Sequence, residues 1–359
     1  MRAHLAHRFV VDIRREDGAQ LRVDPLEVDW TPAIEWRHLT AARQGAVEPM
    51  SIPAPVSIRP SWDKRAGSPY VANLNVGSLD RAALAPQRLT LRYFEQAVDR
   101  AAAALVAQRR LADGEAITWR ICAYEADVDG IDAPPATTFT IDEVGVEPDP
   151  LPARSAAALC SHSEWHGPAG CKGGGDGFPV ILQRAVLDEA IARAQAAGSL
   201  ETGGVLLGRL ARDSDSGDLL LEVTAQVPAV GALAEEASLR FTPGTWQAVQ
   251  AALRLRHSGE HMVGWWHSHP HGVWPCRNCP PERRAVCPSN RAFFSTMDVA
   301  VHRTAFAGAL NVSLLISFLE GAEPHHNLFG WHQGMVRERG YHVVETILLR
   351  EQFHDTHPV

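Results

Sequence analysis

The chain has 359 residues, of which 45% are hydrophobic, and it carries a formal net charge of −8 and six cysteines. This length is enough for two globular domains with cores of their own, so the fold need not depend on disulfides. The negative charge argues against nucleic acid or an anionic membrane surface as the main partner, because either would repel the chain as a whole.

The N-terminal residues contain no apolar stretch long enough for a signal peptide, and no segment approaches the roughly 18 apolar residues of a membrane span. We therefore expect a cytoplasmic protein without a membrane partner. In that reducing compartment, closely spaced cysteines favour metal binding over disulfides.

Residues 1–150 are predicted to form a small, separate α+β domain. Apolar stretches at 8–16 and 116–127 are typical of strands, and residues 91–111 show the apolar spacing of a helix. Pro, Gly and Ser are frequent at 45–70, which predicts irregular chain there. Nothing in this domain indicates a particular chemistry.

A change in composition over 142–178 indicates an interdomain linker, whose Gly-, Cys- and His-containing part is 151–178. Its glycine run lacks the GxxxxGK[ST] pattern and the preceding strand of a phosphate-binding loop, so a linker explains it better. From Phe178 onward, the pattern predicts helices at 184–198 and 242–258, and strands at 203–210, 218–230, 261–269 and 310–320. A further helix is expected after Ser295.

Two histidines form the first part of a predicted metal site. His267 and His269 are two residues apart at the end of an apolar strand, so both imidazoles face the same side and can share one cation. A catalytic zinc takes three protein ligands and leaves the fourth position to water, and Asp298 is the best candidate for the third. Taken alone, Ser295 and Asp298 are also explained as the N-cap and first turn of a helix.

Together with "ETGGVLLG" at 201–208, these residues resemble the JAMM, or MPN-type, metalloproteases. The pattern of that family is a Glu at the head of a strand, then His-x-His-Pro, then Ser-x2-Asp, matched here by Glu201, His267, His269, Pro270, Ser295 and Asp298. The resemblance covers about 179–345 and implies an α/β domain with a central mixed sheet flanked by helices, followed by a tail at 346–359.

The resemblance implies a role for each of these residues. Zinc held by His267, His269 and Asp298 would lower the pKa of its bound water to about 7. Glu201 would accept the proton of that water and pass it to the departing amine. Ser295 would donate a hydrogen bond to the tetrahedral oxyanion.

The chain departs from the family pattern in an insertion at 271–294. His271, Cys276, Cys279 and Cys287 could supply four ligands to a second, structural zinc, although free thiols in an exposed loop are the alternative. Other candidates for the fourth ligand are His325, His326, His332, His166 and Cys171. The segment 160–171 also offers a site of its own, with Cys160, His162, His166 and Cys171 as ligands.

Three other functions explain fewer of these residues. A zinc deaminase matches "PCRNC" and His162-Ser-Glu164, but more than a hundred residues separate the two halves and Glu201, His267, His269 and Asp298 stay unexplained. A zincin is excluded because the chain has no HExxH motif. A non-catalytic, zinc-stabilised protein-binding module would have no use for a base such as Glu201.

The family resemblance implies a substrate class. JAMM enzymes with this motif set cleave peptide or isopeptide bonds after the C-terminal glycine of ubiquitin or a ubiquitin-like protein, either to mature the modifier or to remove it from its conjugates. We expect the setting to be a bacterial ubiquitin-like conjugation pathway linked to antiviral defence, with conjugation enzymes as further partners. The alternative is the processing of a sulfur-carrier protein, which uses the same chemistry.

Overall fold

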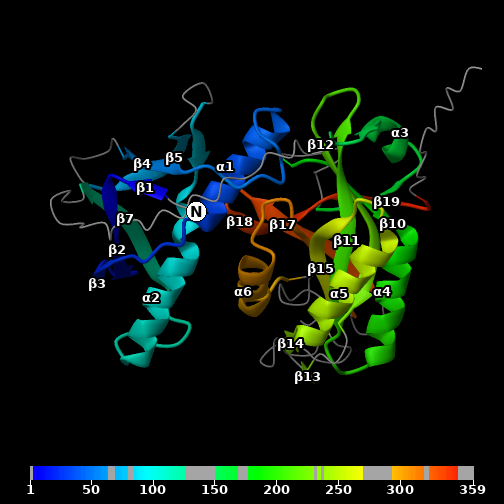
Figure 1. Cartoon of the computed structure of the whole chain (residues 1–359). Helices are drawn as coiled ribbons and strands as arrows, with labels where there is room; N and C mark the ends of the chain where they lie inside the picture. Colours follow the sequence, from blue (N-terminus) through cyan, green and yellow to red (C-terminus); the bar gives the residue numbers. More distant parts are fainter. Residues whose placement is uncertain are drawn as a thin grey trace, which may run out of the picture. The chain divides into compact units, whose positions relative to one another are not determined.

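The structure, a computed structural model of the chain, describes residues 3–63, 69–79, 85–125, 150–168, 177–229, 233–235, 238–269, 293–318 and 323–346. The chain divides into two compact units, one of Met1–Pro150 with Trp331–Met335 and the other of Leu151–Gly330 with Val336–Val359. Figure 1 shows their elements coloured along the sequence. No helix within these ranges is long and apolar enough to cross a membrane.

The described residues of the first unit form two small sheets, ordered β1-β4-β5-β6 and β3-β2-β7, and two α-helices. The strands are β1 (Ala3–Leu5), β2 (His7–Arg15), β3 (Gln20–Pro25), β4 (Val56–Trp62), β5 (Val71–Ser78), β6 (Gln87–Leu89) and β7 (Ile117–Glu125). The helices are α1 (Thr31–Arg43) and α2 (Glu95–Ala107), the latter preceded by a 3-10 turn, η1 (Leu91–Phe94).

The strands predicted at 8–16 and 116–127 are confirmed as β2 and β7, which pair antiparallel along their whole length. Where irregular chain was expected at 45–70, the structure has β4, because Val56 and Ile58 alternate into the core and pair with β5. Packed aromatic rings stabilise this unit: Phe9 lies 5.3 Å from Phe94, and Trp30 stacks on Tyr93.

The second unit is built on a ten-stranded sheet in the order β18-β17-β16-β15-β11-β12-β10-β19-β9, with β8 paired to β11 off this path. Its strands are β8 (Ala153–Arg154), β9 (Glu164–His166), β10 (Val180–Gln183), β11 (Gly203–Asp213), β12 (Leu219–Pro228), β15 (His261–His269), β16 (Val312–Ser317), β17 (His325–His332), β18 (Met335–Arg339) and β19 (Tyr341–Val344). A separate hairpin is formed by β13 (Leu233–Glu235) and β14 (Ser238–Arg240).

The helices described in this unit are α3 (Ala156–Cys160), α4 (Arg184–Ala197), α5 (Pro243–Arg256) and α6 (Thr296–Ala305). Strand β15 is antiparallel to β11 and parallel to β16, so the sheet is mixed. The α/β class, the mixed sheet and the helices predicted at 184–198, 242–258 and after Ser295 are confirmed.

The segment 151–166, where composition indicates a linker, contains regular structure. Strand β8 pairs with β11 and β9 pairs with β19, and α3 lies between them. Arg154 contributes to this attachment, since its Nε lies 3.4 Å from the fully buried Glu222, which also pairs with Arg209. The segment therefore extends the sheet of the second unit. The glycine run at 173–175 lies outside the described residues.

One face of the sheet carries the core that supports the candidate site. Val205 and Leu207 of β11 and Trp265 of β15 pack there with Val249 of α5 and Phe306, which follows α6. Because side chains alternate along a strand, the face that holds Trp265 also holds His267 and His269. Helix α6 is therefore packed on the face toward which the two histidines point.

Candidate metal centre

The structure brings the three predicted metal ligands together. His267 and His269 end β15, and Asp298 lies in the first turn of α6. Nε2 of His267 is 3.2 Å from Oδ1 of Asp298, and Nε2 of His269 is 3.6 Å from Oδ2. One ligand atom from each of the three residues lies within 4.8 Å of the other two. In the part of the chain that the structure describes, no other three His, Cys, Asp or Glu side chains come together in this way.

Pairing of β11 with β15 positions Glu201 beside this triad. Gly203 pairs with His267, the backbone N–H of Ser268 donates to the carbonyl of Thr202 (2.8 Å), and the N–H of Thr202 donates to Oγ of Ser268 (3.1 Å). Continuing this antiparallel register places Glu201 level with His269. A Cβ at Gly203 would lie 2.3 Å from the carbonyl oxygen of Trp266, so the close approach of the two strands requires glycine there.

A capping box fixes Asp298 and Ser295 at the start of α6. The backbone N–H of Asp298 donates to Oγ of Ser295 (3.1 Å), and the N–H of Ser295 donates to Oδ2 of Asp298 (2.7 Å). These bonds are the N-cap and first-turn roles that the sequence predicts for the two residues. Because the Ser295 hydroxyl only accepts here, its hydrogen is available to a ligand. The same carboxylate therefore both caps α6 and faces the two histidines.

The electrostatics of the triad fit a bound cation. His267 is fully buried, and neither ring nitrogen makes a hydrogen bond to the described residues, although Nε2 lies against Asp298. Burial lowers the pKa of His267 and outweighs the opposing effect of Asp298, which favours the neutral imidazole. Burial also opposes the charge of Asp298, but the two imidazoles and the N–H of Ser295 outweigh it and hold the pKa of Asp298 well below its usual value. Neutral imidazoles and an ionised carboxylate are the forms that bind zinc.

Glu201 has a different environment from the ligands. Burial, reinforced by the negative charge of Asp298, raises the pKa of Glu201 to about 7. A carboxyl group that exchanges its proton near neutral pH is suited to general acid–base work. In this arrangement, one carboxylate is kept ionised beside the histidines while the other is able to carry a proton.

Aromatic rings that the sequence analysis did not single out surround the triad. Trp265 stacks on His267 with ring centroids 4.5 Å apart and an interplanar angle of 13°, Phe294 lies 5.8 Å from His267, and Phe293 lies 4.9 Å from His269. The only sequence signal for Trp265 is its position two residues before His267, which puts both on one face of β15. These rings limit the directions in which the imidazoles can turn.

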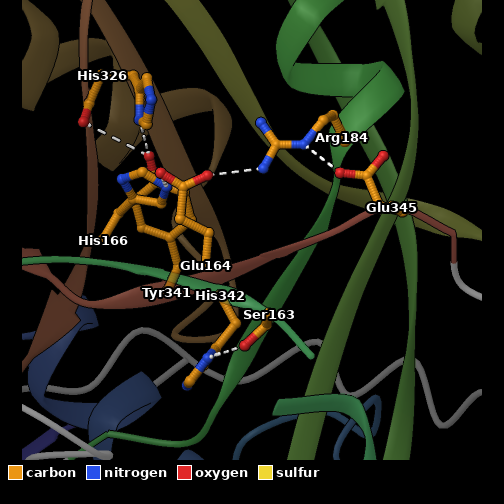
Figure 2. Close-up of polar contacts among 8 residues, drawn as sticks. All are labelled: Ser163, Glu164, His166, Arg184, His326, Tyr341, His342 and Glu345. Atoms are coloured by element: carbon orange, nitrogen blue, oxygen red, sulfur yellow. Dashed lines mark hydrogen bonds and ion pairs between the residues drawn. The ribbon is translucent and has the colours of Figure 1, made fainter. Parts of the chain in front are cut away.

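The four residues proposed for a second zinc, His271, Cys276, Cys279 and Cys287, lie outside the described residues. Of the alternative ligands, His166 and His326 come together, with ring centroids 4.5 Å apart and Tyr341 beside both (Figure 2). His332 falls in the other compact unit, and Cys171 is not described.

The His166–His326 cluster lies on the face of the sheet away from the candidate metal centre. Phe329 of β17 stacks on Phe294 beside His267, and His326 is three residues from Phe329 on the same strand, so it points to the opposite face. Nδ1 of His326 shares a hydrogen bond with the Tyr341 hydroxyl, and Glu164 bridges His166 to Arg184. The two clusters are therefore separate.

Comparison with known proteins gives one family match. Residues 183–274 match the family described as prokaryotic homologs of the JAB domain, a span that includes Glu201, His267 and His269 and ends before Ser295 and Asp298. The chain is also similar to the solution structure of protein DSY2949 from Desulfitobacterium hafniense, at 25% identity over 50% of this chain and 99% of that one, with a TM-score of 0.33. No curated protein matches the chain.

Proposed function

We propose that the second unit, whose residues 183–274 match the prokaryotic homologs of the JAB domain, is a zinc-dependent peptidase that cleaves after the C-terminal glycine of a ubiquitin-like protein. The observation that carries this proposal is the environment of His267. Nε2 of this fully buried imidazole makes no hydrogen bond to the described residues and faces Oδ1 of Asp298 at 3.2 Å, and a cation shared with His269 and Asp298 would give that nitrogen a partner.

Two imidazoles and one carboxylate are a ligand set typical of catalytic zinc, which leaves a position open for water or substrate. A zinc ion held by these three residues would act as a Lewis acid, polarising a carbonyl and lowering the pKa of water to about 7. A purely structural zinc takes four protein ligands, whereas three converge here among the described residues.

Glu201 and Ser295 supply the remaining chemistry. Hydrolysis forms a carbon–oxygen bond from water to the glycine carbonyl and breaks the carbon–nitrogen bond, so one proton must move from water to the amine. A carboxylate oxygen of Glu201 takes that proton and returns it to the departing amine. The Ser295 hydroxyl, which already accepts the N–H of Asp298, donates its own hydrogen to the oxyanion.

The limited exposure of the centre supports a slender substrate. The side chain of His269 is 19% exposed and that of His267 is fully buried. A Gly-Gly tail has no side chains, so an extended tail of this kind reaches a recessed centre that a bulkier segment could not enter. We propose three kinds of partner in the bacterial cytoplasm: the modifier, its conjugates and conjugation enzymes.

The test uses a ubiquitin-like protein that carries a short extension after its Gly-Gly tail, incubated with the zinc-loaded protein and analysed by mass spectrometry. We expect a product that ends at the second glycine. A matched substrate with Ala-Ala in place of Gly-Gly should stay intact. Cleavage of both substrates at other bonds, or of neither across several modifiers, would contradict the proposed specificity.

A further inference from the structure

A second contact joins the strand and the helix that carry the metal ligands. Trp265 precedes His267 by two residues on β15, and His302 follows Asp298 by four residues on α6. The indole Nε1–H of Trp265 donates to Nδ1 of His302 at 3.1 Å. Residues two apart on a strand, or four apart on a helix, lie on the same face. The hydrogen bond between Trp265 and His302 therefore joins the same faces of β15 and α6 as the contact between His267 and Asp298.

This hydrogen bond is deeply buried. Trp265 is 1% exposed and His302 is fully buried. An indole N–H can only donate, so Nδ1 of His302 must be unprotonated and the ring proton must be on Nε2. Burial lowers the pKa of His302 to about 3, which agrees with a neutral ring. Removing the acceptor would leave the indole N–H buried without a partner, which is costly.

The indole that His302 holds is the one that packs on a metal ligand. Trp265 stacks almost parallel on His267, and the ring of Phe306 is also nearly parallel to the indole, at 12°. A turn or shift of the indole would therefore turn His267. His302 also moves with Asp298, since both belong to α6.

We propose that His302 is a positioning residue of the metal centre, which fixes the Trp265 indole against His267 and sets the spacing between that ligand and Asp298. The inference rests on the proposed function only in that the triad binds a metal. It assigns to His302 no contact with metal or substrate.

The test compares Zn²⁺ affinity, measured by competition with a chromophoric chelator, in the parent and two variants. His302→Leu removes the acceptor while keeping an apolar side chain. His302→Gln removes the imidazole and keeps a flexible side chain whose amide oxygen can accept the indole N–H. Removal of groups that orient metal ligands typically weakens metal binding about 10- to 100-fold, so we expect a loss of that order for His302→Leu and recovery to within a few-fold for His302→Gln.

Two further measurements separate positioning from stability. In the metal-free protein, the Trp265 indole N–H should exchange slowly with solvent in the parent and in His302→Gln, and faster in His302→Leu, as read by NMR. Val249→Ala is the matched control, because Val249 is buried in the same core cluster on α5 and has no part in the hydrogen bond. It should lower thermal stability and leave the Zn²⁺ affinity within about twofold.

Zn²⁺ affinity of His302→Leu equal to that of the parent would overturn the inference, and so would equal losses in His302→Leu, His302→Gln and Val249→Ala. A parent that binds no Zn²⁺ at His269 and Asp298 would overturn the proposed function together with this inference. Normal Zn²⁺ binding by the parent without cleavage of any substrate would contradict the proposed function alone.

Discussion

Two carboxylates of the candidate metal centre, Asp298 and Glu201, have different environments. Asp298 is held ionised by its hydrogen-bond partners, while burial raises the pKa of Glu201 to about 7. Both side chains are largely buried, but only Asp298 accepts the backbone N–H of Ser295 and faces the imidazoles. In the proposed mechanism, this difference in partners makes Asp298 a metal ligand and Glu201 the group that carries the proton.

Gly203 gives a prediction that depends on backbone contact alone. In Gly203→Ala, the new Cβ would meet the carbonyl oxygen of Trp266, so β11 must move away from β15 and carry Glu201 with it. We expect kcat to fall by at least about tenfold, since displacing a catalytic group by 1 Å can cost about 100-fold. Steady-state kinetics test this. Gly217→Ala is the control: nothing lies within 4 Å of the new Cβ, so although the positive φ of +73° should cost some stability, kcat should stay unchanged.

The capping box at the start of α6 stabilises that helix and, in the proposed mechanism, also supplies a catalytic hydroxyl. Ser295→Ala removes the side-chain acceptor for the N–H of Asp298, which should cost about 1 kcal/mol of unfolding free energy, and it removes the proposed oxyanion donor as well. Ser295→Thr keeps both functions. Denaturant unfolding and kcat should therefore change together in Ser295→Ala and much less in Ser295→Thr. Unchanged kcat in Ser295→Ala would remove Ser295 from the mechanism.

The His166–His326 cluster, which joins β9, β17 and β19, gives a prediction about how stability depends on pH. Burial, helped by the nearby His166, lowers the pKa of His326 to about 4, while Glu164 acts in the opposite direction. A histidine in the unfolded chain binds its proton near pH 6.5, so as pH falls the unfolded state is protonated before the folded state. The free energy of unfolding that the neutral His326 contributes is therefore lost between about pH 6.5 and about pH 4. His326→Gln should flatten the fall of the melting temperature over that window. His325→Gln, at an exposed neighbouring position, should retain the slope of the parent, and equal slopes in all three proteins would contradict the prediction.

Much of the second unit could be predicted from the sequence because its signals are local. The periodicity of 184–198 and 242–258 is confirmed by α4 and α5, and the alternation that puts His267 and His269 on one face is a property of any strand. Pairing between distant residues is what the sequence could not show. The bond between Trp265 and His302 spans 37 positions, and neither residue carries a motif. Strands β8 and β9 are too short to give a periodic pattern, so composition alone indicated a linker there.

At the scale of the whole molecule, the metal should stabilise one compact unit. The triad lies within the second unit, so zinc bound to the folded state alone adds about 2.7 kcal/mol to its stability at a free concentration 100 times Kd. Chelation should lower the melting temperature by roughly 5–10 °C, given about 2–4 °C per kcal/mol for a domain of this size. Calorimetry with chelator and then with added zinc tests this, with His269→Ala as the insensitive control. An equal response in His269→Ala would place the metal elsewhere.

The two units differ in how much their sequences say about function. The described residues within 1–150 form sheets and helices around Phe9, Trp30 and Phe94, and the sequence of this unit carries no motif that indicates a chemistry. The cysteine-rich insertion carries a spacing typical of zinc ligands, and it lies outside the described residues, so the second zinc remains a prediction from sequence.

Zinc content and turnover measured together in Glu201→Gln separate the metal site from the proposed proton carrier. The variant keeps the size of the side chain and removes its ability to take a proton, while His267, His269 and Asp298 are untouched. We predict that one triad-bound zinc per chain is retained, as in the parent, and that cleavage of the Gly-Gly-extended substrate falls by about 10²- to 10⁴-fold. Parent-like cleavage by Glu201→Gln, or loss of its zinc, would contradict the assignment of Glu201 as the proton carrier beside a separate metal triad.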